Sequence, residues 1–135
     1  MNSKFKLLSW VLRITSAIIL LQTLFFKFTG APESIYIFET VGMEPFGRYA
    51  SGIAELVASI LFFVPGLTWL GAFIGLGVMS GAIISHLTVL GIEVQEDGGV
   101  LFVMAIIVFI CCAILLFMYR KDIPIIGSRF NDVDS

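Results

Sequence analysis

The sequence predicts an all-α fold: a four-helix transmembrane bundle with a short amphipathic helix between the first and second spans. Hydrophobic residues make up 59% of the 135 residues and charged residues 13%, whereas an ordinary soluble domain is about half apolar and a quarter charged. The mean hydropathy is +1.04. The apolar residues gather in continuous segments of about 20 residues, the length that an α-helix needs to cross about 30 Å of hydrocarbon. A membrane barrel would instead show segments of about ten residues with alternating polarity.

A chain of this length has room for a single membrane domain over residues 1–135. The first apolar segment follows Lys4 and Lys6, as in a signal peptide, but it is longer than the core of a signal. Its candidate cleavage point precedes Pro32, a poor setting for a signal peptidase, so we expect a retained helix. The spans are expected at about 7–28, 46–64, 67–90 and 98–119, with a cytoplasmic tail at 120–135.

Basic residues concentrate near the two ends of the chain, whereas the loop GIEVQEDGG at 91–99 has acids and no base. Because cytoplasmic segments carry the excess of Lys and Arg, we expect both termini on the cytoplasmic side of a bacterial inner membrane. Lys27 and Arg48 oppose this assignment, since both flank the connection that it places outside. The basic residues that support it are Lys4, Lys6, Arg13, Arg120, Lys121 and Arg129.

Charge and cysteine content exclude several kinds of site. The formal net charge is −2 and there is no basic run that could neutralise several phosphates, so nucleic acid is not an expected partner. Cys111 and Cys112 are adjacent within an apolar stretch and match neither a CxxC redox pair nor a metal-ligand spacing. We interpret them as small apolar residues of the core and predict no metal site.

The connection between the first two spans has the pattern of a short helix. Pro32 suits a first helical turn, Ile35, Phe38 and Val41 recur at helical spacing, and Gly42 offers a stop. Such a helix would lie at the membrane surface or fold over the mouth of the bundle. An irregular loop is the alternative.

Polar side chains recur at similar depth on three spans. At 1.5 Å per residue, Glu55 lies about 10 Å inward of Arg48 on the same helical face. A carboxylate exposed to lipid costs several kcal/mol, so Glu55 should point into the bundle and be protonated or paired with Arg48 or Lys27. The predicted result is a polar pocket, open outward, formed by Gln22, Lys27, Arg48, Glu55 and His86.

These ionisable groups allow two interpretations. As a functional site, His86 would pass protons to or from Glu55 or a bound ligand, because its ordinary pKa is near 6.5. As a structural network, Lys27, Arg48, Glu55 and His86 would only hold helices together. The glycines of the third span, Gly71 and Gly75, then Gly77 and Gly81, have the four-residue spacing of close helix packing.

Several motifs occur in an order typical of one family. A lysine precedes a Gly and Pro exit from the first span, GMEP leads into the second, G-x-x-E lies within it, and a histidine comes late in the third. The residues are Lys27, Gly30, Pro32, Gly42, Met43, Pro45, Gly52, Glu55 and His86. Residues 12 to 120 thus resemble the DoxX-like family of small bacterial four-helix membrane proteins. Some members are linked to quinone-coupled sulfur oxidation or to membrane oxidoreductase complexes that handle thiols and oxidative stress.

The resemblance implies a quinone-associated oxidoreductase subunit. In the pocket inferred from the residues, Glu55 and His86 would then be the catalytic proton carriers, and Gln22, Lys27 and Arg48 would bind the ligand. Quinone would be a bound ligand rather than an intrinsic cofactor, and the partners would be the lipid bilayer with an oxidoreductase subunit or a second copy. The chain has no paired cysteines in a loop, so a thiol exchange of its own is not expected. The alternatives are a small proton-coupled transporter and a non-catalytic assembly subunit.

Overall fold

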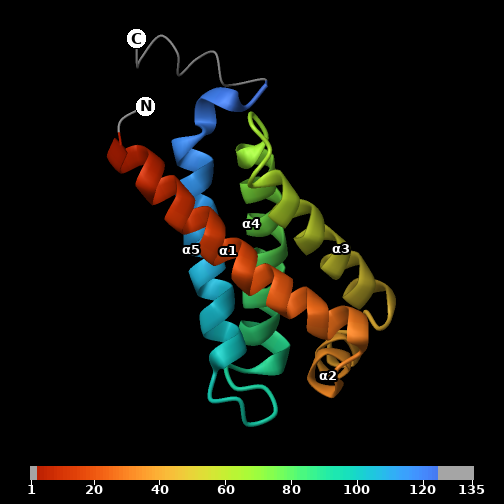
Figure 1. The fold of residues 1–135 in the computed structure, drawn as a ribbon. Coiled ribbons are helices and arrows are strands. Elements are labelled where there is room, and N and C mark those ends of the chain that lie inside the picture. Colours follow the sequence, from red (N-terminus) through yellow and green to blue (C-terminus); the bar gives the residue numbers. More distant parts are fainter. Residues whose placement is uncertain (1–2, 125–135) are drawn as a thin grey trace.

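The computed structural model describes residues 3–124, and Figure 1 shows them as a bundle of long helices. The start of α1 and the end of α5 lie at one end of the bundle, and α2 lies at the other (Figure 1). The predicted four-helix bundle with a short helix after its first member is therefore confirmed. The elements are α1 (Ser3–Thr29), α2 (Pro32–Thr40), α3 (Phe46–Leu61), α4 (Thr68–Ser85), the π-helix η1 (His86–Leu90), α5 (Val100–Met118) and the 3₁₀-helix η2 (Arg120–Asp122).

Three of these helical segments are long and apolar enough to cross a membrane: Ser3–Thr29, Thr68–Leu90 and Val100–Met118. They correspond to the first, third and fourth expected spans. The second expected span, 46–64, is shorter than predicted, because α3 has 16 residues and a length of about 24 Å. Gly66, with φ +82°, turns the chain into α4 soon after α3 ends. Of the expected tail, residues 125–135 with Arg129 lie outside the described residues.

Close packing dominates the half of the bundle that contains the α3–α4 turn. A Cβ added at Gly71 would lie 2.8 Å from the Ala58 carbonyl oxygen, and one at Gly75 would lie 2.7 Å from the Cys112 sulfur. The close packing predicted for Gly71 and Gly75 is confirmed. Cys111 and Cys112 are both buried in the apolar core, as expected.

The prediction for the second glycine pair is wrong. A Cβ added at Gly77 or Gly81 would meet nothing within 4 Å in the described part of the chain. The physical reason is the course of α3, which lies against α4 near their connecting turn and then diverges from it toward α2 (Figure 1). Four-residue spacing makes close approach possible, but it does not supply the neighbouring helix.

Polar contacts hold the packed half together. Arg13 Nη1 and Thr68 Oγ1 both donate to the Phe62 carbonyl oxygen, at 3.2 and 3.0 Å. The Ser9 and Tyr119 hydroxyls lie 2.5 Å apart and join α1 to the end of α5. The hydrogen bonds from Arg13 and Thr68 satisfy the Phe62 carbonyl group, which α3 leaves free where it ends.

The short helix α2 lies across the opposite end of the bundle. Pro32 occupies its first turn, as expected, and Gly42 follows it with φ +78°, a conformation that favours glycine. α2 contacts α1, α3 and η1. Its Ser34 side chain is buried, whereas Glu39 and Thr40 are exposed. The sequence allowed this helix to lie at the membrane surface or to fold over the mouth of the bundle. In the structure, it folds over the end of the bundle (Figure 1).

Candidate functional site

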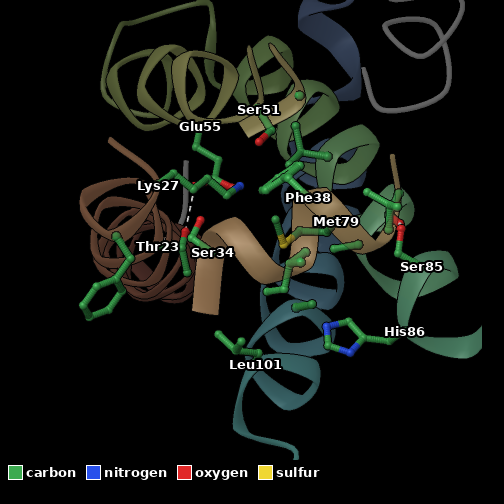
Figure 2. Close-up of a pocket in the computed structure, with 18 of the residues that line it drawn as sticks. Thr23, Lys27, Ser34, Phe38, Ser51, Glu55, Met79, Ser85, His86 and Leu101 are labelled. Atoms are coloured by element: carbon green, nitrogen blue, oxygen red, sulfur yellow. Dashed lines mark hydrogen bonds and ion pairs between the residues drawn. The ribbon is translucent and has the colours of Figure 1, made fainter. Parts of the chain in front are cut away.

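A cavity of about 360 Å³ lies between the helices in the half of the bundle that contains α2 (Figure 2). All four long helices, α2 and η1 contribute to its lining. Most of the lining side chains are apolar, including Ile37, Met79 and Leu101. Glu55, Lys27 and Thr23 lie on one side of the cavity and His86 on the other (Figure 2). The remaining polar side chains of the described lining are Glu33, Ser34, Ser51 and Ser85.

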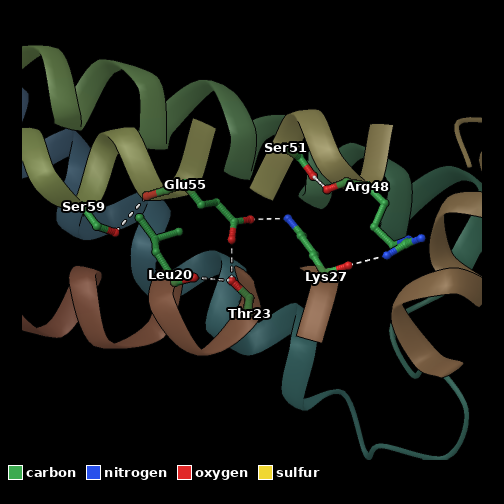
Figure 3. Close-up of polar contacts among 7 residues, drawn as sticks. All are labelled: Leu20, Thr23, Lys27, Arg48, Ser51, Glu55 and Ser59. Carbon is green, nitrogen blue, oxygen red and sulfur yellow. Dashed lines mark hydrogen bonds and ion pairs between the residues drawn. The ribbon is translucent and has the colours of Figure 1, made fainter. Parts of the chain in front are cut away.

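Glu55 is almost completely buried, at 1% exposure, and both of its carboxylate oxygens have partners. Lys27 Nζ forms an ion pair with Oε1, and the Thr23 hydroxyl lies 2.7 Å from Oε2 (Figure 3). The Thr23 hydroxyl is also 3.0 Å from the Leu20 carbonyl oxygen, so its hydrogen is shared between two acceptors. A fully paired carboxylate of this kind is compatible with burial inside the membrane, where an unpaired charge would be costly.

Local sequence explains why these groups meet. Thr23 and Lys27 are four residues apart and therefore lie on one face of α1. On α3, a Cβ added at Gly52 would lie 2.9 Å from the Phe28 ring, which shows how closely α1 passes α3 at this point. Because Gly52 has no side chain, α1 can bring Thr23 and Lys27 within bonding distance of Glu55, one turn further along α3.

Arg48 is buried but lies outside the set of described residues that line the cavity. Its Nε lies 2.9 and 3.0 Å from the two carboxylate oxygens of Glu44, and its Nη1 donates to the Lys27 carbonyl oxygen (Figure 3). A guanidinium that binds the last carbonyls of a helix stabilises that helix end. Lys27, and not Arg48, is therefore the cation that pairs with Glu55.

Gln22 is exposed and is also outside the described cavity lining. Neighbouring residues of an α-helix point about 100° apart, so Gln22 faces away when Thr23 faces the cavity. Thr23 was missed by the sequence analysis. Its spacing of four residues from Lys27 is the signal that could have identified it.

His86 reaches the cavity from the other side and is 5% exposed. Its Nδ1 lies 2.9 Å from the Gly91 carbonyl oxygen, and its ring packs edge-on against Phe102 with centroids 5.4 Å apart. A carbonyl oxygen only accepts hydrogen bonds, so this contact places a hydrogen on Nδ1. The other ring nitrogen, Nε2, is then left for the cavity, into which Figure 2 shows the ring pointing.

The backbone around His86 is held by its own turn and by the following loop. The Gly91 N–H donates back to the His86 carbonyl oxygen at 2.9 Å, which closes the π-helix at its end. In the loop, the Asp97 carboxylate accepts hydrogen bonds from the backbone N–H groups of Val94, Gly99 and Leu101 at 2.8 to 3.2 Å. Burial acts to raise the pKa of Asp97, but these hydrogen bonds outweigh it and the pKa is lowered.

The structure thus separates the five residues predicted as one site. Lys27 and Glu55 are in direct contact, and His86 lines the same cavity on its opposite side (Figure 2). Gln22 and Arg48 point elsewhere. Within residues 3–124, no three His, Cys, Asp or Glu side chains are grouped so that they could hold a metal ion.

Comparison with known proteins identifies a family. A family model of DoxX matches residues 8–90, more than half of the chain. The match covers α1 to η1 and so includes Lys27, Glu55 and His86. Comparisons with curated proteins and with solved structures gave no match. With its long apolar helices and this match, the chain is a multi-pass membrane protein that belongs to the DoxX family.

Proposed function

We propose that this protein is a quinone-associated subunit of a membrane oxidoreductase and that its cavity binds the quinone headgroup. The observation that carries the proposal is the cavity itself, which combines apolar walls with the Lys27–Glu55–Thr23 cluster on one side and His86 on the other. Its volume of about 360 Å³ lies within the range of small-molecule sites, about 300 to 1,000 Å³.

The residues present fit a ring with polar oxygens at opposite edges. Apolar side chains such as Met79 and Leu101 match the faces of the ring. The Lys27 ammonium has hydrogens beyond the one that faces Glu55 and so provides a donor near one edge. Near the other edge, Nε2 of the neutral His86 ring accepts a hydrogen bond from a quinol O–H, and it donates to a quinone oxygen when the ring is charged. Small-molecule sites are usually built in this way, with mostly apolar walls and a few polar groups that fix orientation.

When bound, quinone supplies the redox chemistry, taking up an electron pair from a partner subunit together with two protons. His86 keeps a hydrogen on Nδ1 toward Gly91, so its Nε2 accepts a proton from the cavity or, when the ring is charged, donates one. The Lys27 ammonium lies beside the Glu55 carboxylate. This ion pair is the second group in the cavity, after His86, that can hold a proton.

The same geometry disfavours proton-coupled transport of a cation. Glu55 is paired with Lys27 and hydrogen-bonded to Thr23, so a cationic substrate would have to displace an ammonium group of the chain itself. A non-catalytic assembly subunit would need no cavity lined by His86. The chemistry of the cavity therefore supports a ligand that is apolar, uncharged and hydrogen-bonding.

We further propose a bacterial inner-membrane location with both termini in the cytoplasm. The exposed Lys4 and Lys6 of α1 and Lys121 of η2 belong to the end of the bundle where α1 begins and α5 ends. The loop with Glu93, Glu96 and Asp97 lies at the other end. This distribution has the excess of basic residues expected on the cytoplasmic side.

Binding of a soluble short-tailed benzoquinone to the purified protein in nanodiscs tests the function. Ligand at 100 times its Kd should raise the free energy of unfolding by about 2.7 kcal/mol, measured as a higher Tm. His86→Leu should weaken binding of the reduced, quinol form of this probe about tenfold, because it removes the Nε2 acceptor for a quinol O–H. Thr88→Val is the control, since Thr88 is exposed on η1 and lies outside the described cavity lining. A wild-type protein that no quinone stabilises would rule the proposal out.

A further inference from the structure

We infer that the cavity opens sideways into the bilayer between α3 and α4 and that the tail of a tailed quinone lies in this gap. This inference rests on the proposed function, because it names the part of the ligand that the gap receives. It adds a route and a ligand class: an amphiphile with a ring that enters the cavity and an apolar tail that remains in contact with lipid.

The packing along α4 gives the first evidence for the gap. At Gly71 an added Cβ would lie 2.8 Å from the Ala58 carbonyl oxygen of α3, so the two helices touch there. At Gly77 and at Gly81, further along the same helix, an added Cβ would meet no described atom within 4 Å. The close approach of α3 therefore ends between the first and third turns of α4.

The residues on the two sides of the gap give the second evidence. Ala50 and Ser51 of α3, with Gly77, Gly81 and Ser85 of α4, all line the cavity. Ala50, Gly77 and Gly81 are also exposed at the surface of the molecule, and Ser51 and Ser85 are half-exposed. Residues that both line a cavity and reach the surface mark the place where the cavity opens.

The depth of the gap decides what it opens into. Gly77 and Gly81 lie about 14 and 20 Å from the start of the 23-residue segment Thr68–Leu90, which itself spans about 34 Å. This is the middle of a helix long enough to cross the hydrocarbon core of about 30 Å. The opening therefore faces lipid acyl chains rather than water.

The route from the aqueous side is covered. α2 contacts α1, α3 and η1, and its Ile37 and Phe38, with Val41 just after it, line the cavity at that end. On the far side of the cavity, α3 and α4 are in contact at Gly71. A ligand dissolved in the membrane reaches the polar groups through the lateral gap without moving either barrier.

A pair of probes with the same benzoquinone ring, one with a decyl tail and one without a tail, tests the inference. Affinities are measured from ligand-dependent Tm in nanodiscs of one lipid composition, so the partition of the tail into lipid is the same for every variant. Gly81→Leu places an apolar side chain in the gap. It should weaken binding of the tailed probe about tenfold more than binding of the tail-less probe, a difference equivalent to roughly two methylene groups of buried tail.

Two variants serve as controls. Ala113→Leu adds a similar side chain on an exposed position of α5 outside the described cavity lining, and both probes should bind as in wild type. Ser51→Leu narrows the gap from α3 and should reproduce the effect of Gly81→Leu, which keeps the test decisive if one variant does not fold.

The possible outcomes are distinct. If Gly81→Leu and Ser51→Leu leave both probes unchanged, the lateral gap is not the tail site, while the proposed function stands. If they weaken both probes equally, the added side chain fills the ring site itself and the inference is again wrong. If wild-type protein binds neither probe, the proposed function fails, and the inference fails with it.

Discussion

The two halves of this bundle are built from the same helices and differ in how their small and polar residues are used. Near the α3–α4 turn, Gly71 and Gly75 each receive a neighbouring helix, and the core is closed. Near α2, Gly77 and Gly81 receive none, and a cavity of about 360 Å³ remains. Identical glycine spacing thus gives contact in one half, where α3 approaches Gly71 and α5 approaches Gly75, and space in the other half.

Polar groups differ between the halves in the same way. In the packed half, Arg13 and Thr68 are satisfied by a backbone carbonyl at the end of α3. In the cavity half, Glu55 and Lys27 form an ion pair. The Nε2 atom of His86 has no part in the hydrogen bond to Gly91 and is left to contact a ligand. The comparison indicates that the packed half maintains the fold and that the cavity half carries the chemistry. Three predictions test this division.

The largest expected effect comes from removing one member of the buried ion pair. Lys27→Met leaves Glu55 buried without its cation, and breaking a buried pair in this way costs about 3 to 5 kcal/mol of unfolding free energy. The double variant Lys27→Met/Glu55→Gln should recover most of this loss, since no uncompensated charge remains. Unfolding in denaturant, with the exposed Lys6→Met as control, measures both values. Equal instability of the single and double variants would contradict the pairing.

A smaller effect is expected from matched glycine substitutions. Gly71→Ala should lower the free energy of unfolding by about 1 to 3 kcal/mol, because its methyl group meets the backbone of α3 and overpacks the contact. Gly81→Ala should leave it unchanged or raise it by up to about 1 kcal/mol, because no described atom lies within 4 Å of the new methyl group and alanine favours the helix more than glycine does. Thermal unfolding of the two variants side by side makes the comparison. A similar loss at both positions would mean that α3 and α4 do not diverge.

The sequence was informative about depth and poor about rotation. Hydropathy located the helices, and the cost of a charge in lipid correctly directed Glu55 inward. The depth of a residue in the membrane does not show whether Lys27 or Arg48 pairs with Glu55. A prediction from depth alone also placed the exposed Gln22 in the same pocket as the buried residues. The orientation of a side chain around its helix depends on which neighbour each face meets. That is a tertiary property. The spacing of Thr23 from Lys27 places both residues on one face of α1, but the contact of Thr23 with Glu55 depends on where α3 lies.

The smallest expected effect concerns the loop that holds the backbone beside His86. Asp97→Asn weakens the hydrogen bonds to the start of α5 and should cost about 1 kcal/mol near neutral pH, as for other helix-capping carboxylates. The pKa of Asp97 is lowered in the folded protein, so its contribution is complete above the ordinary carboxyl pKa of about 3.9 and is lost as the pH falls through the lower folded value. The difference in unfolding free energy between wild type and Asp97→Asn should therefore be constant from about pH 5 to about pH 7, which are about one and three units above the ordinary carboxyl pKa. The difference should shrink in stronger acid. Glu96→Gln, an exposed neighbour, should show no such change. A difference that persists unchanged in acid would mean that the Asp97 carboxylate does not hold this loop.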